Sequence, residues 1–172
     1  MNFLELIWLI PFVPLIGAGI MLLFGRSMPK SMVSLISPGA VLVSFLLSLG
    51  AFVQLMGLPE RRHEVVLGPW ISFLKADWGF LLDPLSGVMI MVVTGIGFLI
   101  HVYSIGYMGH EHGPRHGGYY RFFGYLNLFV FFMLMLVLAN NYPLLFVGWE
   151  GVGLCSYLLI GFYFHKKSAG DA

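Results

Sequence analysis

Charged side chains are scarce in this sequence, since Asp, Glu, Lys and Arg make up only 10% of its 172 residues. Soluble domains carry about 25% of such residues, so the composition excludes an ordinary soluble protein. The nine Lys and Arg residues exceed the eight Asp and Glu residues by a single charge. They form no basic patch that could neutralise nucleic-acid phosphates. We therefore expect no nucleic-acid partner.

Cysteine is almost absent, because Cys155 is the single one and lies inside an apolar run. An internal disulfide is therefore excluded, and no Cys/His spacing suits zinc or an iron–sulfur cluster. The His-x-His spacing at His110 and His112 falls in a glycine-rich connection, which favours a solvated loop over rigid metal ligands. We expect neither a metal nor a cofactor-binding site in this chain, so any redox cofactor would belong to a partner.

Long apolar runs are the dominant feature of the chain: 59% of its residues are hydrophobic and the mean hydropathy is +0.88. Each run approaches or exceeds the roughly 20 residues that a spanning helix needs. We expect the first run to be retained, because no basic region or small-residue cleavage site marks a signal peptide. The sequence predicts an all-α integral membrane protein, a single transmembrane domain over 1–172 with about five helices at 3–25, 32–57, 79–108, 119–139 and 142–164.

The connections between these runs predict orientation. Residues 58–78 form the longest connection, and their mixture of charged and apolar residues predicts a hairpin or surface helix outside the membrane. Because Lys and Arg favour cytoplasmic loops, we expect the N-terminus outside and the C-terminus in the cytoplasm. Six of these residues fall on the expected cytoplasmic side, namely Arg26, Lys30, Arg115, Arg121, Lys166 and Lys167, against Arg61, Arg62 and Lys75 on the other.

Polar residues inside the third and fourth runs are candidate supporting residues. Asp83 precedes Pro84, which predicts a cap at the start of the third helix rather than an ion-entry role. Asn127 is expected to bond a neighbouring helix, and His101 is expected to be a neutral histidine bonded between helices, with a proton relay as the alternative. His101 belongs to one helical stripe that should face other helices, formed with Ser86, Thr94, Gly97 and Ser104.

Glu150 is the main functional candidate, because it lies near the middle of an apolar run from 142 to 164. An ionisable residue at that depth is costly unless it faces protein or a water-filled cavity, so it usually marks an ion path or proton relay. Helical spacing places Glu150 on one face with Tyr157 and two glycines, Gly153 and Gly161. A purely structural hydrogen bond to a neighbouring helix is the alternative interpretation.

Four stretches of the sequence resemble one known family. GWEGVGLCSYLLIGFY at 148–163 is the most specific, and LDPLS at 82–86, VVTGIGFLIHVYSIGYM at 92–108 and YYRFFGYLNLF at 119–129 support it. Together they resemble the antiporter-like subunit L, or chain 5, of respiratory complex I, the proton-pumping NADH:quinone oxidoreductase. In that family the glutamate matching Glu150 pairs with a lysine two helices later and belongs to a proton channel. His101 and Asp83 match family positions without an assigned role.

The resemblance implies a membrane subunit without redox chemistry of its own. NADH, flavin, iron–sulfur clusters and quinone would belong to partner subunits, in a bacterial-type plasma (inner) membrane or an organelle equivalent. Family members have many more helices, so we expect this chain to be the N-terminal portion of a longer subunit, with the rest of that subunit and other complex I membrane subunits as partners. Two alternatives stay open: the large subunit of a multisubunit sodium/proton antiporter, and a non-catalytic scaffold in which Glu150 is structural.

Overall fold

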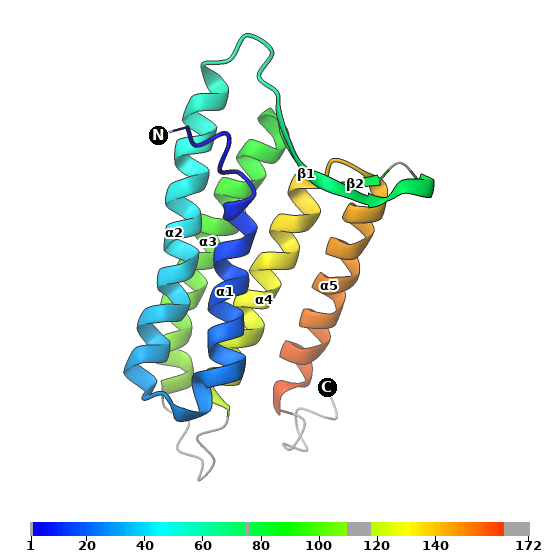
Figure 1. Ribbon diagram of the computed structural model, residues 1–172. Coiled ribbons are helices and arrows are strands. Elements are labelled where there is room, and N and C mark those ends of the chain that lie inside the picture. Colours follow the sequence, from blue (N-terminus) through cyan, green and yellow to red (C-terminus); the bar gives the residue numbers. More distant parts are fainter. Residues whose placement is uncertain (1, 75, 110–117, 164–172) are drawn as a thin grey trace.

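A computed structural model describes residues 2–74, 76–109 and 118–163 (Figure 1). Five of its helices are long and apolar enough to cross a membrane, as the sequence predicts. They are α1 (Leu9–Phe24), α2 (Lys30–Met56), α3 (Pro84–Gly109), α4 (Tyr119–Leu138) and α5 (Tyr142–Ile160).

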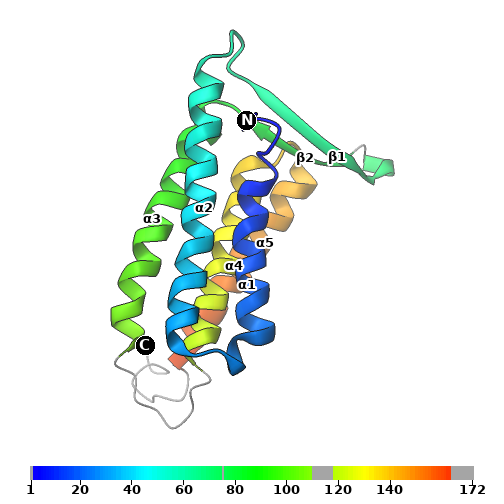
Figure 2. The same ribbon diagram turned by 60° about the vertical axis from the view of Figure 1, so that its left-hand side comes forward.

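The connection between α2 and α3 is an antiparallel hairpin of β1 (His63–Ile71) and β2 (Ala76–Leu82). It confirms the hairpin that the sequence offered as one of two choices for this region. The hairpin lies across the ends of α4 and α5 (Figures 1 and 2). Phe80 of β2 is fully buried there and meets Phe12 of α1 edge-on, with 6.4 Å between ring centroids. The protein is therefore helical within the membrane, with a small sheet at one end.

Two helices begin later than the sequence predicts. The first helix begins at Leu9 and not at residue 3. Before it, the backbone nitrogens of Leu6 and Leu9 donate to the carbonyl oxygens three residues earlier, at 3.1 and 2.9 Å. Pro11 explains this start, because proline lacks an N–H and disfavours helix before it, whereas the first helical turn tolerates it. The third helix begins at Pro84 instead of residue 79, because residues 79–82 pair with β1.

The helices pack around α4, which contacts α1, α3 and α5, while α2 packs against α1 and α3. Helix α5 lies at the edge of the bundle and rests on α4 and on β2 (Figure 1). Two glycines allow that close approach. A Cβ atom at Gly148 would lie 2.6 Å from the backbone nitrogen of Leu136, and one at Gly151 would lie 2.1 Å from the Phe132 ring.

Candidate functional site

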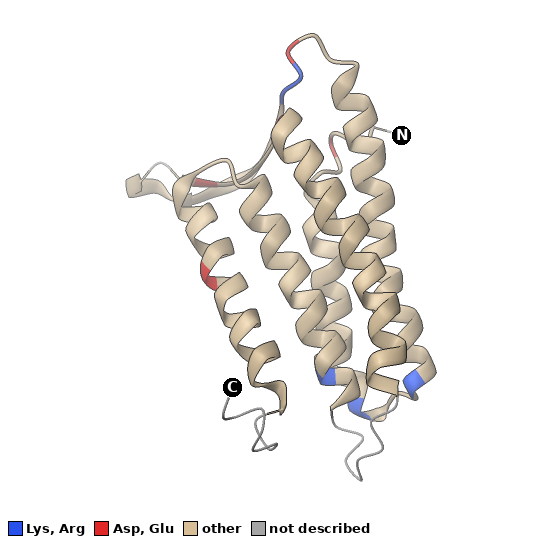
Figure 3. Ribbon diagram, turned by 180° about the vertical axis from the view of Figure 1, so that it is seen from behind, with Lys and Arg blue, Asp and Glu red and all other residues tan. Residues whose placement is uncertain are grey.

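Glu150 lies near the middle of α5, on an exposed face and not among the residues of α5 that are buried in the bundle. The buried residues of α5 are Leu144, Gly148, Gly151 and Cys155, whereas Glu150 is exposed. It is the single acidic residue of this helix and appears as the red band of α5 in Figure 3. None of the lysines or arginines within the described ranges forms an ion pair with it. Any partner for this carboxylate must therefore come from outside that part of the chain.

The rest of this face is open as well. Tyr157 is 75% exposed, and a Cβ built on Gly153 or Gly161 would meet nothing within 4 Å. All three residues are exposed, as Glu150 is. The face combines one carboxylate and one phenol with space beside the helix backbone, so a neighbouring helix or water can reach Glu150 along it.

His101 is fully buried on the opposite side of the bundle, in the stripe that the sequence predicted to face other helices. Its Nδ1 atom is 2.7 Å from the carbonyl oxygen of Gly97. A carbonyl oxygen only accepts, so Nδ1 donates, while Nε2 has no partner among the residues described. The predicted bond between helices is therefore wrong for Nδ1, because the carbonyl one turn earlier on α3 lies within reach of the ring.

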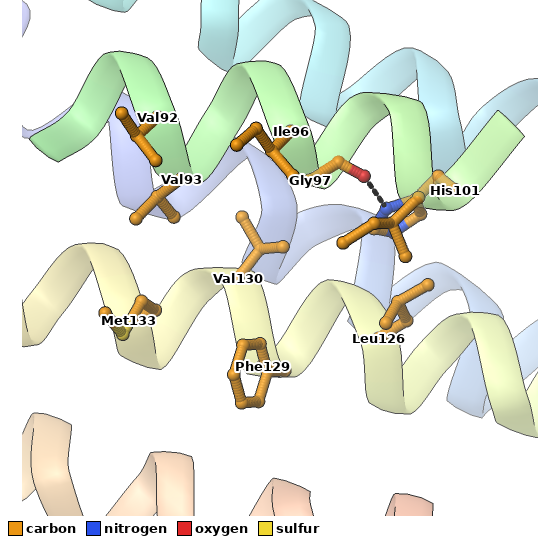
Figure 4. Close-up of a pocket in the computed structure, with 10 residues that line it drawn as sticks. Val92, Val93, Ile96, Gly97, His101, Leu126, Phe129, Val130 and Met133 are labelled. Atoms are coloured by element: carbon orange, nitrogen blue, oxygen red, sulfur yellow. Dashed lines mark hydrogen bonds between the residues drawn. The ribbon is translucent and has the colours of Figure 1, made fainter. Parts of the chain in front are cut away.

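Figure 4 shows His101 beside a groove of about 240 Å³ between α3 and α4. Apart from the imidazole and the Gly97 backbone, the groove is lined by Val, Ile, Leu, Phe and Met side chains. Its composition suits the hydrocarbon interior of a membrane and supplies no further acid or base beside His101.

Asn127 is also fully buried and ties α4 to α2, as predicted. Its amide nitrogen donates to the hydroxyl of Ser37 and to the carbonyl oxygen of Phe123, the latter at 3.1 Å. The α2 side of this contact was not predicted from the sequence. The spacing of Ser37, Ser44 and Ser48 on one helical face could have indicated it, because all three are fully buried.

Asp83 acts as the predicted cap of α3. Its carboxylate accepts a 2.7 Å bond from the backbone nitrogen of Ser86, and the Ser86 hydroxyl accepts a 2.8 Å bond from the Asp83 nitrogen. This reciprocal arrangement satisfies backbone donors that a helix start would leave unpaired. Capping therefore accounts for an aspartate at position 83 without an ion-entry role.

The structure does not bring the candidate residues together in one site. Tyr157 shares the outer face of α5 with Glu150, but His101 and Asn127 belong to the buried interior that α4 forms with its other neighbours. The predicted loop histidines at 110–116 lie outside the described residues. Within the described ranges, no three His, Cys, Asp or Glu side chains gather to hold a metal ion.

Comparisons with known proteins point to one family. The family described as "NADH-Ubiquinone oxidoreductase (complex I), chain 5 N-terminus" matches residues 70–123. The "NADH-quinone oxidoreductase subunit L" of Mycobacterium tuberculosis is 45% identical over 170 residues, which are 96% of this chain and 26% of that protein. The "NADH-ubiquinone oxidoreductase chain 5" of Triticum aestivum is 44% identical over 167 residues, 95% of this chain and 24% of that protein.

A solved structure is similar as well. The "Structure of Mrp complex from Dietzia sp. DQ12-45-1b" includes a chain with a TM-score of 0.67 and 33% identity, over 90% of this chain and 16% of that chain. The chain thus spans about a quarter of the length of the curated relatives it matches.

Proposed function

We propose, on the premise that this chain is homologous to the N-terminal part of subunit L (chain 5) of NADH:quinone oxidoreductase, that it takes part in proton translocation coupled to electron transfer, with Glu150 carrying the proton. The observation that carries this proposal is the position of Glu150, exposed and near the middle of α5. Redox chemistry with NADH, flavin, iron–sulfur clusters and quinone would take place in partner subunits.

The physical argument starts from the cost of the charge. Placing a carboxylate at the centre of a bilayer costs about 2.5–3.5 kcal/mol on insertion scales. The described helices leave Glu150 on an open face, so protein from the remainder of a longer subunit or from other membrane subunits, or a water-filled cavity, would have to surround it. A covering segment that brings a cation near Glu150 favours its ionised form, and withdrawal of that cation favours its protonated form. Glu150 would then take up and release a proton as its surroundings change.

Two substitutions test this role in the assembled complex. Glu150→Gln keeps the volume and hydrogen-bonding capacity but cannot ionise, so proton uptake into sealed vesicles should fall strongly. NADH oxidation would fall with it where the two are tightly coupled. Glu150→Asp keeps an ionisable group on a shorter stem and should retain more of both activities. The amount of intact complex is measured for each variant, so that loss of assembly is not mistaken for loss of transport. Full proton uptake by the Gln variant would disprove the proposal.

A sodium/proton antiporter subunit is the second candidate, since the sequence leaves it open and the chain is similar to a chain of an assembly other than complex I, the Mrp complex. The two functions differ in what drives the movement of protons. A complex I subunit acidifies vesicles when NADH is oxidised, whereas an antiporter exchanges protons when a sodium gradient is imposed without NADH. A non-catalytic scaffold, the third candidate, predicts the opposite order of the variants. Gln would be well tolerated there, and Asp, which displaces the hydrogen bond, would be worse.

A further inference from the structure

A second groove lies between the start of α4 and the end of α5. Its volume is about 240 Å³, and it is lined by Arg121, Tyr125, Tyr157, Leu158, Gly161 and Phe162. Unlike the groove beside His101, this one combines a cation and two phenol hydroxyls with an apolar wall. Its lining therefore combines hydrogen-bond donors with apolar side chains.

The donors of this groove are largely unused within the described chain. Arg121 approaches only the Tyr125 hydroxyl, with Nε and Nη2 at 3.4 and 3.3 Å, and its guanidinium lies 5.8 Å from the centre of that ring. The two nitrogen-to-oxygen distances, 3.4 and 3.3 Å, exceed the usual range of N–H···O hydrogen bonds. No acidic side chain of the described ranges pairs with Arg121, and the Tyr157 hydroxyl makes no hydrogen bond to them. Several hydrogen-bond donors therefore line this groove, and no acidic side chain of the described residues pairs with them.

We propose that this α4–α5 groove binds the headgroup phosphate of an anionic phospholipid. The guanidinium fork supplies paired donors that match phosphate oxygens, and the two phenol hydroxyls supply further donors. Leu158 and Phe162 contact the adjoining hydrocarbon. A carboxylate or a free phosphate would satisfy the donors but would leave the apolar wall uncovered.

Depth and charge both favour a lipid headgroup. Arg121 lies in the first turn of α4 and Tyr157 in the last turn of α5, which places the groove at the membrane surface and not beside Glu150. The same end carries Arg26 and Lys30, and Figure 3 shows blue bands at this end of the bundle, with a further blue stretch in the connection before β1 at the other end. Positive side chains at one membrane surface attract anionic lipids, and basic pockets between spanning helices bind their headgroups. This proposal does not depend on proton transfer by Glu150.

Photocrosslinking in the native assembly tests the site. A benzophenone amino acid replaces Leu158, and the membrane contains equal amounts of phosphatidylglycerol and phosphatidylcholine. We expect phosphatidylglycerol to be enriched about threefold among the adducts relative to its share of the membrane lipid. A preference of that size corresponds to the modest free energy of one exposed charge pair. Arg121→Gln should return the adducts to the bulk lipid ratio. Arg26→Gln is the matched control, because it removes the same charge from the same surface outside the groove, and it should leave the enrichment intact.

Three results of the Leu158 crosslinking with Arg121 and its variants would overturn the proposal. One is a bulk lipid ratio with Arg121 in place, and another is equal loss of enrichment in the Arg121→Gln and Arg26→Gln variants. The third is a protein adduct at position 158, which would show that a protein segment fills the groove. Tyr157→Phe keeps the ring and removes only the hydroxyl, so it tests the groove should the arginine variant fail to assemble. It should lower the enrichment, and an unchanged ratio would contradict the proposal.

Discussion

Gly148 marks the point where α5 comes closest to α4. An alanine Cβ there would lie 2.6 Å from the nitrogen and 2.7 Å from the Cα of Leu136, so the backbone of α4 would have to move. Overpacking of this kind costs about 1–3 kcal/mol, which exceeds the roughly 1 kcal/mol that alanine gains over glycine in a helix. Gly148→Ala should therefore lower the thermal inactivation temperature of the assembled complex.

Gly19 of α1 supplies the control for that substitution. A Cβ at Gly19 would meet nothing within 4 Å, so Gly19→Ala should leave the thermal inactivation temperature unchanged or raise it slightly through helix propensity. Equal inactivation temperatures for the two alanine variants would show that the α4–α5 contact at Gly148 does not limit stability.

Single residues were predictable where a local rule fixes their partner. Asp83 caps α3 because Asp followed by Pro starts helices. Asn127 was expected to bond a neighbouring helix because a buried amide needs a partner, although Ser37 itself was not foreseen. His101 was not predictable in the same way, because a bond to its own helix and a bond to another helix satisfy the ring equally well. Only the packing of α3 decides between them.

Asn141 joins two elements at the turn between α4 and α5. Its side-chain oxygen accepts a 3.0 Å bond from the Leu144 nitrogen, and its amide donates a 2.7 Å bond to the Asp77 carbonyl of β2. Asn141→Ala removes the cap and the link to the hairpin, at about 1 kcal/mol for each. Hydrogen exchange in the assembled complex should then become faster both in the first turn of α5 and in β2.

Asn141→Ser separates the two contributions. Serine keeps an oxygen that can cap α5 but has no amide to reach Asp77. Exchange should therefore become faster in β2, while the Leu144 amide stays protected. Faster exchange at Leu144 in both variants would show that serine fails as the cap, contrary to this prediction.

The elements themselves were predictable from apolar run length, but two of their starts were not. Long apolar runs indicate helices without fixing their first residue, and strands of a hairpin are apolar too. Residues 79–82 continue the apolar character of α3, yet they pair with β1 and end at the cap that Asp83 provides. The hairpin therefore takes residues that hydropathy alone assigns to the membrane.

For the whole molecule, the candidate site depends on how the helices are arranged, which local patterns do not encode. The sequence placed Glu150 and His101 each on a polar face, but α4 lies between α3 and α5 and keeps the two faces apart. The α3 stripe faces the buried interior, whereas the Glu150 face is open. A path from His101 to Glu150 would have to cross α4, so the open face of α5 is the more direct approach to the carboxylate.

The charged connections at the two ends of the bundle predict the orientation of the whole molecule in the membrane. Among the described residues, Lys and Arg occur at the α1–α2 connection and at the start of α4, and others occur at the opposite end of the bundle, before β1. The positive-inside rule then places the hairpin outside the cytoplasm. Ser72 and Ser27 are both exposed, in the hairpin and in the α1–α2 connection, so Ser72→Cys and Ser27→Cys make a matched pair. Cys155 is fully buried and should contribute little background. An impermeant thiol reagent added to spheroplasts should label the Ser72→Cys variant and not the Ser27→Cys variant, and the reverse result would invert the topology.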